Sequence, residues 1–91
     1  MNVVTKGIVL SETSYGESSK ILNILTEDYG LIGVISKGSK NIKSKLRGIS
    51  GKMAYAEFTI SYKEKGLSTL VDGNILNSFK NIFYNTIIFN T

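Results

Sequence analysis

Short runs of alternating apolar and polar residues, separated by glycines, extend from Val3 to Leu76. The clearest run covers residues 54–62, where every second side chain is apolar: Ala54, Ala56, Phe58, Ile60 and Tyr62. This period of two predicts a half-buried strand, and the turn-forming residues 63–66 predict a hairpin whose returning strand starts near Leu67. Gly66 is suited to a positive φ in the turn, and Gly73 predicts a bulge or bend in the returning strand.

Three further strands are predicted upstream, over residues 3–12, 19–27 and 31–36. Gly16 and Gly30 lie in the two connections between them, and a longer connection follows the third strand. Five short strands with glycine turns and one long connection are typical of an all-β, five-stranded Greek-key barrel of the oligonucleotide-binding (OB) type. Because this barrel carries many different ligands, the fold alone assigns no function.

The pattern changes after residue 78. Phe79, Ile82, Phe83 and Ile87 recur at helical spacing, which predicts the start of a C-terminal helix. This helix needs a covering surface, which is either the barrel itself, if the helix folds back on it, or a further domain; the width of its apolar arc favours the further domain. We therefore expect an OB-fold domain over residues 1–78 and, over residues 79–91, the first turns of a helix that leads into a further, helical domain.

Composition argues against catalysis. The 91 residues suit one small domain, and they include no histidine and no cysteine. The commonest general base, the best thiol nucleophile and the commonest zinc ligands are therefore absent, so we expect no catalytic residue, no metal site and no cofactor. No apolar run approaches the roughly 20 residues that cross a bilayer, and the N-terminus lacks a signal-peptide layout. Elimination leaves a cytoplasmic protein that is not an enzyme and has no membrane partner.

Positive charge is concentrated between residues 37 and 52, which we call the basic segment. It carries six cations and no acid, so the net charge of +4 comes entirely from this connection. The six cations are Lys37, Lys40, Lys43, Lys45, Arg47 and Lys52. Polar residues alternate with them, namely Ser36, Ser39, Asn41, Ser44 and Ser50, and glycines loosen the backbone. Such a segment is suited to follow a phosphate backbone, with the cations neutralising charge and the hydroxyl, amide and backbone N–H groups donating hydrogen bonds.

Two other interpretations fit the basic segment less well. A loop made basic for solubility would be the better interpretation of an isolated lysine pair, but six cations without an acid favour nucleic acid. An anionic membrane surface would need more large apolar residues than Ile42, Leu46 and Ile49 provide.

Outside the segment, Tyr55 is expected to face away from the core and to be available for stacking on a base, although packing is the commoner role of such a tyrosine.

An ordered set of motifs runs along the chain: Gly7-Ile8-Val9-Leu10, Tyr15-Gly16-Glu17-Ser18-Ser19-Lys20-Ile21-Leu22, Leu25-Thr26, Tyr29-Gly30 and Lys37-Gly38. This set resembles the N-terminal part of the RecO family of bacterial DNA repair proteins. Basic residues follow, and Tyr62, Gly66-Leu67 and Thr69-Leu70 fit the family's fourth-to-fifth strand hairpin. The resemblance runs from Met1 to about Phe79. The chain departs from the family pattern at Ile42, at Gly51-Lys52-Met53 and at Asn74, positions that affect loop conformation more than charge.

The resemblance implies a recombination mediator that acts in DNA repair and homologous recombination. Members of this family bind single- and double-stranded DNA, anneal complementary strands, and work with RecR to load RecA onto strands coated by single-stranded-DNA-binding protein. Their second domain is helical, often holds zinc through cysteines, and docks the tail of the single-stranded-DNA-binding protein; here that domain would follow residue 91. The six cations of the basic segment would then contact DNA phosphates.

Two alternatives stay open on the sequence alone. In the first, the barrel is a protein-interaction module that docks a partner such as RecR. In the second, it binds RNA within the translation machinery. A comparison of DNA and RNA oligonucleotides of one sequence separates the second alternative from DNA binding, because the 2′-hydroxyl is the feature that differs.

Overall fold

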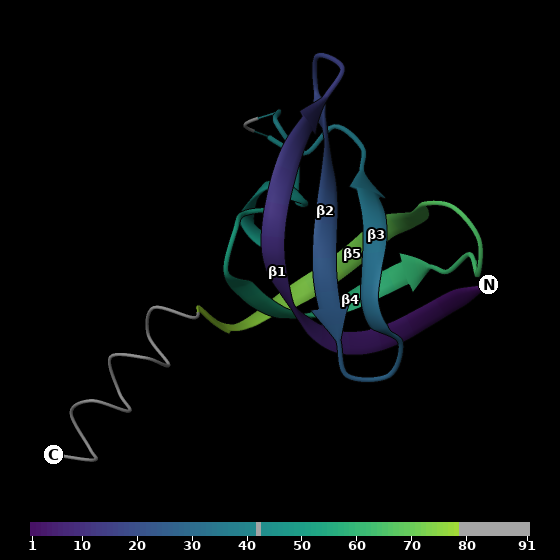
Figure 1. Cartoon of the computed structure of the whole chain (residues 1–91). Coiled ribbons are helices and arrows are strands. Elements are labelled where there is room, and N and C mark those ends of the chain that lie inside the picture. Colours follow the sequence, from purple (N-terminus) through teal and green to yellow (C-terminus); the bar gives the residue numbers. More distant parts are fainter. Residues whose placement is uncertain (42, 79–91) are drawn as a thin grey trace, which may run out of the picture.

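The computed structural model describes residues 1–41 and 43–78, whose strands close into a barrel (Figure 1). The elements are β1 (Asn2–Tyr15), β2 (Ser19–Thr26), β3 (Gly30–Ser36), the 3₁₀ helix η1 (Arg47–Ile49), β4 (Ala54–Ser61) and β5 (Ser68–Ser78). Around the barrel the strand order is β1-β2-β3-β5-β4, with β3 and β5 parallel and the other neighbours antiparallel. This order confirms the predicted all-β, five-stranded Greek-key barrel of the OB type.

Strand β1 belongs to two ladders and bends between them. Its first half pairs with β4 and its second half with β2, while Gly7 and Ile8 pair with both strands. Figure 1 shows β1 curving from one partner to the other. A Cβ atom at Gly7 would lie 2.8 Å from the carbonyl oxygen of Leu25, so the bend leaves no room for a side chain at this position.

The core follows the alternation of the sequence in β4. Ala54, Ala56, Phe58 and Ile60 are buried, and the residues between them are partly exposed. The first three strands contribute side chains without exposed surface, namely Val9, Leu22, Ile24 and Val34. Leu25 and Leu31 face outward instead and are 46% and 61% exposed, so the apolar runs of β2 and β3 bury only one of their two faces.

The β4–β5 hairpin forms as predicted, but its irregularities do not lie at Gly73. The φ of Gly66 is 85°, which confirms the turn. In β5 the register shifts at Val71 and at Leu76, whereas Gly73 pairs regularly with Phe58. A Cβ atom at position 73 would lie 2.9 Å from the carbonyl oxygen of Glu57 on β4 and 2.8 Å from Cδ1 of Ile49, so glycine is required there for the close approach of these atoms and not for a bulge.

The barrel closes at a short seam between β3 and β5. Two residue pairs form this parallel ladder, Val34 with Ser68 and Ile35 with Thr69. At the other side of the sheet, β1 continues to Tyr15 although its apolar pattern ends near Leu10, because polar residues there still pair with β2. The helix predicted over residues 79–91 lies outside the described residues. Within the described ranges, no helix is long and apolar enough to cross a membrane.

Candidate nucleic-acid interface

The basic segment connects β3 to β4 and sends two apolar side chains into the barrel. Leu46 and Ile49 belong to the buried core, where they are 8% and 3% exposed. Between them, Arg47 and Gly48 face solvent, because one turn of η1 separates the two buried positions. The sequence predicted a flexible connection with few apolar residues; the structure shows a segment that is anchored by those residues against β4 and β5.

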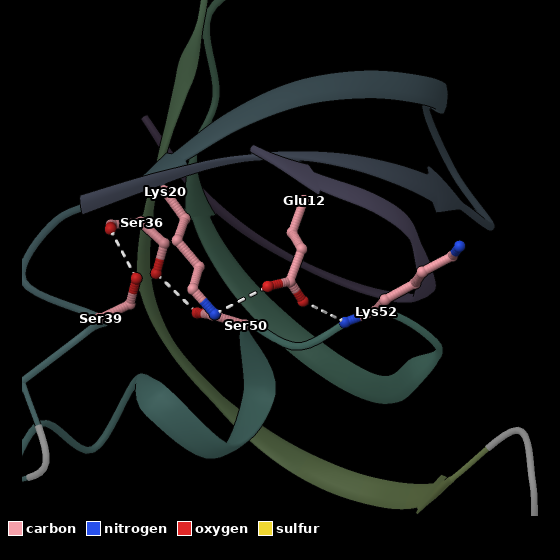
Figure 2. A network of polar contacts seen from close by, with 6 residues as sticks. All are labelled: Glu12, Lys20, Ser36, Ser39, Ser50 and Lys52. Carbon is pink, nitrogen blue, oxygen red and sulfur yellow. Dashed lines mark hydrogen bonds and ion pairs between the residues drawn. The ribbon is translucent and has the colours of Figure 1, made fainter. Parts of the chain in front are cut away.

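Three serines of this region are buried and are not available to a phosphate. Ser36, Ser39 and Ser50 have no exposed surface. The Oγ atoms of Ser36 and Ser50 lie 2.6 Å apart, and the Ser39 hydroxyl donates to the Ser36 carbonyl oxygen at 3.0 Å (Figure 2). The expectation that these hydroxyls donate to nucleic acid is therefore wrong. They satisfy one another inside the fold, as buried polar groups must.

Two other polar side chains of the segment stabilise local turns. Asn41 accepts a hydrogen bond from the backbone N–H of Lys43 through Oδ1, and the Ser44 hydroxyl accepts one from the N–H of Leu46. Backbone N–H groups of Asn41, Ser44 and Arg47 each donate to the carbonyl three residues earlier. These turns stabilise the described parts of the segment, from which the cations project.

The six predicted cations differ in how free their side chains are. Lys37, Lys43, Lys45, Arg47 and Lys52 are exposed. Lys40 is partly buried: its backbone N–H donates to Ser18, and its Nζ lies 3.4 Å from the carbonyl oxygen of Gly16. Five of the predicted residues are thus presented to solvent, while Lys40 also joins the segment to the β1–β2 turn.

Two acids from distant strands meet the basic segment in space, which its sequence does not reveal. Asp72 of β5 lies 3.7 Å from the Nζ of Lys45, and both side chains are more than half exposed, so this pair contributes little to stability. Glu12 of β1 contacts the segment at Lys52. A further cation, Lys20 of β2, pairs with Glu12 and was not among the predicted site residues. Only the antiparallel register of β1 and β2 brings Lys20 to this position.

The Glu12 carboxylate joins three parts of the chain. Oε1 lies 2.9 Å from the Nζ of Lys20, and Oε2 accepts a hydrogen bond from the backbone N–H of Lys52 at 2.6 Å (Figure 2). The hydrogen bond from Lys20 holds the pKa of Glu12 below its ordinary value, and the Lys52 N–H adds to this effect against the opposing effect of desolvation. Glu12 is therefore a charged acceptor over the whole neutral range.

The tyrosines of the described residues differ in their surroundings. Tyr29 and Tyr62 pack against each other with ring centroids 4.5 Å apart. Tyr55 is partly buried and lines a shallow hollow of about 480 Å³ with Ile8 and Leu25, together with the charged residues Lys6 of β1 and Glu27, which follows β2. Tyr15 is 54% exposed at the end of β1. Packing accounts for the Tyr29 and Tyr62 rings.

The side chains of the basic segment are suited to bind anions. In residues 1–41 and 43–78, no group of three or more potential ligands from His, Cys, Asp and Glu is placed to hold a metal ion. The basic segment instead presents lysines and an arginine on an ordered backbone, the arrangement that suits phosphate groups.

Comparison with known proteins identifies the relatives of this barrel. A family model described as "Recombination protein O N terminal" matches residues 1–79. The chain belongs to this family. It is 40% identical over 82 residues to the DNA repair protein RecO of Bacillus pumilus, a match that covers 90% of this chain and 32% of the relative. It is 42% identical over 77 residues to the RecO of Caldicellulosiruptor bescii, covering 85% of this chain and 31% of the relative.

The RecO of Listeria monocytogenes is 38% identical over 77 residues, with 85% of this chain and 30% of the relative covered. The chain therefore spans about a third of the length of the curated relatives that it matches. The resemblance predicted from the sequence motifs is confirmed, including its end near Phe79.

Proposed function

We propose that this domain is a cytoplasmic, non-enzymatic module that binds DNA through its phosphate backbone, within a protein of DNA repair and recombination. The family and the names of its relatives support the role in repair and recombination. The observation that carries the binding mode is the basic segment, in which five exposed cations project from a backbone anchored by Leu46 and Ile49.

Binding by this surface is electrostatic and independent of sequence. Lys37, Lys43, Lys45, Arg47 and Lys52 contact phosphates directly, and Lys40 joins them when its weak contact with Gly16 is exchanged for a phosphate. The exposed Lys45–Asp72 pair opposes this little, because exposed ion pairs are worth at most about 1 kcal/mol. No base-specific contact is part of the proposal.

A pair of double variants tests the assignment. Lys37→Ala with Lys43→Ala removes two cations of the basic segment, whereas Lys63→Ala with Lys65→Ala removes two exposed lysines of the β4–β5 turn. The first variant should weaken binding of a labelled oligonucleotide at every sequence and lower the salt slope by roughly two, since each phosphate contact contributes about one. The second should change both quantities much less. Equal effects would show that net charge matters and the segment does not.

For a full-length protein of this family, the finer proposal is a recombination mediator. It would bind single- and double-stranded DNA, anneal complementary strands, and help RecR load RecA onto strands coated by single-stranded-DNA-binding protein, which would dock on a helical domain. The family membership supports this proposal. Annealing of complementary oligonucleotides by the full-length protein tests it, with the basic-segment double variant expected to anneal more slowly.

The outer face of the barrel favours a second candidate function, docking of a protein partner such as RecR. Leu31, Leu25, Ile8 and Tyr55 are opposite one another in successive ladders, so their side chains form a row across four strands. Leu25 and Leu31 are well exposed in this row. Leu25→Ser with Leu31→Ser should abolish partner binding and leave DNA binding unchanged if this face is the docking surface. Retention of partner binding would remove the candidate.

RNA binding is distinguished by a direct comparison. The exposed cations contact phosphates, which DNA and RNA share, so the proposed mode predicts similar affinities for single-stranded DNA and RNA of one sequence. A preference for RNA of tenfold or more would indicate recognition of the 2′-hydroxyl and would support the RNA-binding alternative.

A further inference from the structure

Glu12 is an acid placed at the surface that we propose for DNA binding. Its side chain is 34% exposed, and its carboxylate lies within hydrogen-bonding distance of both Lys20 and the backbone of Lys52. A negative charge beside a phosphate-binding surface repels the ligand and offsets part of the attraction of the cations. The contacts of Glu12 with Lys20 and with the backbone of Lys52 indicate a structural contribution that compensates for this repulsion.

The two ends of the basic segment are held in different ways. Near its start, the buried hydroxyls of Ser36, Ser39 and Ser50 join the end of β3 to the residue that follows η1. Near its end, the hydrogen bond from Lys52 N–H to Glu12 is followed by one from Met53 N–H to the Val9 carbonyl oxygen at 2.7 Å. Glu12 thus supplies a side-chain contact that fixes the exit of the segment to β1.

The backbone at this exit needs such a restraint. Met53 has a φ of 73°, a left-handed conformation that a residue with a side chain adopts only at a cost. Gly51 lies two residues earlier, and glycine leaves the backbone many alternatives. Without the contact to Glu12, the backbone at Gly51 and Lys52 would sample several arrangements, and DNA binding would have to select one of them.

We propose that Glu12 is a positioning residue for nucleic-acid binding: by pairing with Lys20 and accepting the Lys52 N–H, it holds the exit of the basic segment in the arrangement that DNA requires. The order that it imposes outweighs the repulsion between its carboxylate and the phosphates. This inference rests on the proposed function, because it concerns the same surface.

Two matched variants separate positioning from charge. Glu12→Gln and Glu17→Gln each remove one negative charge with little change in shape, and Glu17 lies exposed in the β1–β2 turn, close to the point where Lys40 contacts Gly16. In the described part of the chain, the Glu17 side chain makes no ion pair or hydrogen bond. If charge alone matters, both variants bind DNA more tightly than the unmodified domain.

Positioning predicts opposite signs for the two variants. Glu17→Gln should bind an oligonucleotide slightly more tightly, whereas Glu12→Gln should bind roughly three- to tenfold more weakly, the size expected when about one side chain must be ordered on binding. The salt slope should stay unchanged in both, because no phosphate contact is lost. Binding by Glu12→Gln that is as tight as that of Glu17→Gln would overturn the inference.

Hydrogen exchange in the unmodified domain provides a second test that does not depend on a variant. The Lys52 and Met53 amides should already be protected in the free domain, and oligonucleotide binding should increase their protection little. Amides that exchange freely and become protected only on binding would overturn the inference. Failure of the proposed function is recognised separately, because then the Lys37→Ala, Lys43→Ala double variant would also bind normally.

Discussion

The hydroxyls of Ser36 and Ser50 lie 2.6 Å apart in the buried end of the barrel, where they join the last residue of β3 to the residue after η1. Neither hydroxyl has exposed surface, so each depends on the other for a partner in place of water. An uncharged contact between Ser36 and Ser50 therefore holds most of the basic segment in place. Substitution of these serines changes the stability of the segment without changing its charge.

Ser50→Ala should destabilise the domain without altering its charge. It leaves the Ser36 hydroxyl buried without this partner, which costs about 1–3 kcal/mol. Urea unfolding measures the loss. The double variant Ser36→Ala with Ser50→Ala should be less destabilised than the sum of the single variants, because both groups of the pair are then removed. Additive losses would show that the two hydroxyls do not interact.

DNA binding should weaken steeply with salt. If three to five cations of the basic segment contact phosphates at once, the log–log slope of affinity against salt should be about −2 to −4. Titration of a labelled oligonucleotide at several salt concentrations gives this slope. A flat response would contradict phosphate binding, however tight the complex.

Single alanine substitutions at Lys43, Lys45 and Arg47 should separate binding from folding. All three side chains are exposed, so each substitution should change the free energy of unfolding by no more than about 0.5 kcal/mol. Each should lower affinity uniformly across sequences, and the effects should add. Lys45→Ala also removes the contact with Asp72, which adds little because that pair is exposed. A variant that unfolds would indicate a structural role for its cation.

Stability should depend on the protonation of Glu12 in acid. The hydrogen bond from Lys20 lowers the pKa of Glu12 in the folded domain, and the backbone N–H of Lys52 adds to this effect. A carboxylate with a lowered pKa stabilises the fold above its unfolded pKa, and this contribution is lost as the pH falls through the folded pKa. The stability difference between the unmodified domain and Glu12→Gln should therefore be fully present well above the unfolded pKa of glutamate, about 4.3, and should shrink as the pH falls below it. A constant difference would contradict this linkage.

The apolar residues 79–91 give a prediction that rests on sequence alone. If Phe79, Ile82, Phe83 and Ile87 form one helical face, a chain of residues 1–91 should self-associate, because burying each such side chain is worth roughly 1.5–3 kcal/mol. A chain of residues 1–78 should be a folded monomer that still binds DNA. Analytical ultracentrifugation compares the two. Folding of the longer chain alone, with both monomeric, would show that these residues belong to the barrel.

The strands could be predicted because their pattern is local. Alternation in β4 indicates which of its faces is buried, and Gly66 marks the turn that follows. Gly73 was misinterpreted, because a side chain there would meet the carbonyl oxygen of Glu57 on β4 and the side chain of Ile49, both of which reach it from other parts of the chain. The sequence pattern shows that a glycine at this position is unusual, but it does not show which neighbouring residues require it.

The positive charge of the candidate site could be predicted from the sequence, but its structure could not. Leu46 and Ile49 are single apolar residues in a polar run, so no periodicity marks them as core. The serines around them have the composition of a phosphate-binding loop, yet burial assigns them to one another. Glu12 and Lys52 are 40 positions apart, and their contact depends on the closed barrel. Contacts of this kind follow from the fold and not from any local signal.

The short seam between β3 and β5 affects how this domain opens and aggregates. If its two residue pairs separate, every other ladder can persist, and the barrel becomes an open sheet in the order β3-β2-β1-β4-β5. Such a sheet has two free edges, and unpaired strand edges are templates for pairing with another chain. Variants that weaken the seam should therefore aggregate before they lose most of their β-structure. The short β3–β5 ladder thus protects the domain from aggregation.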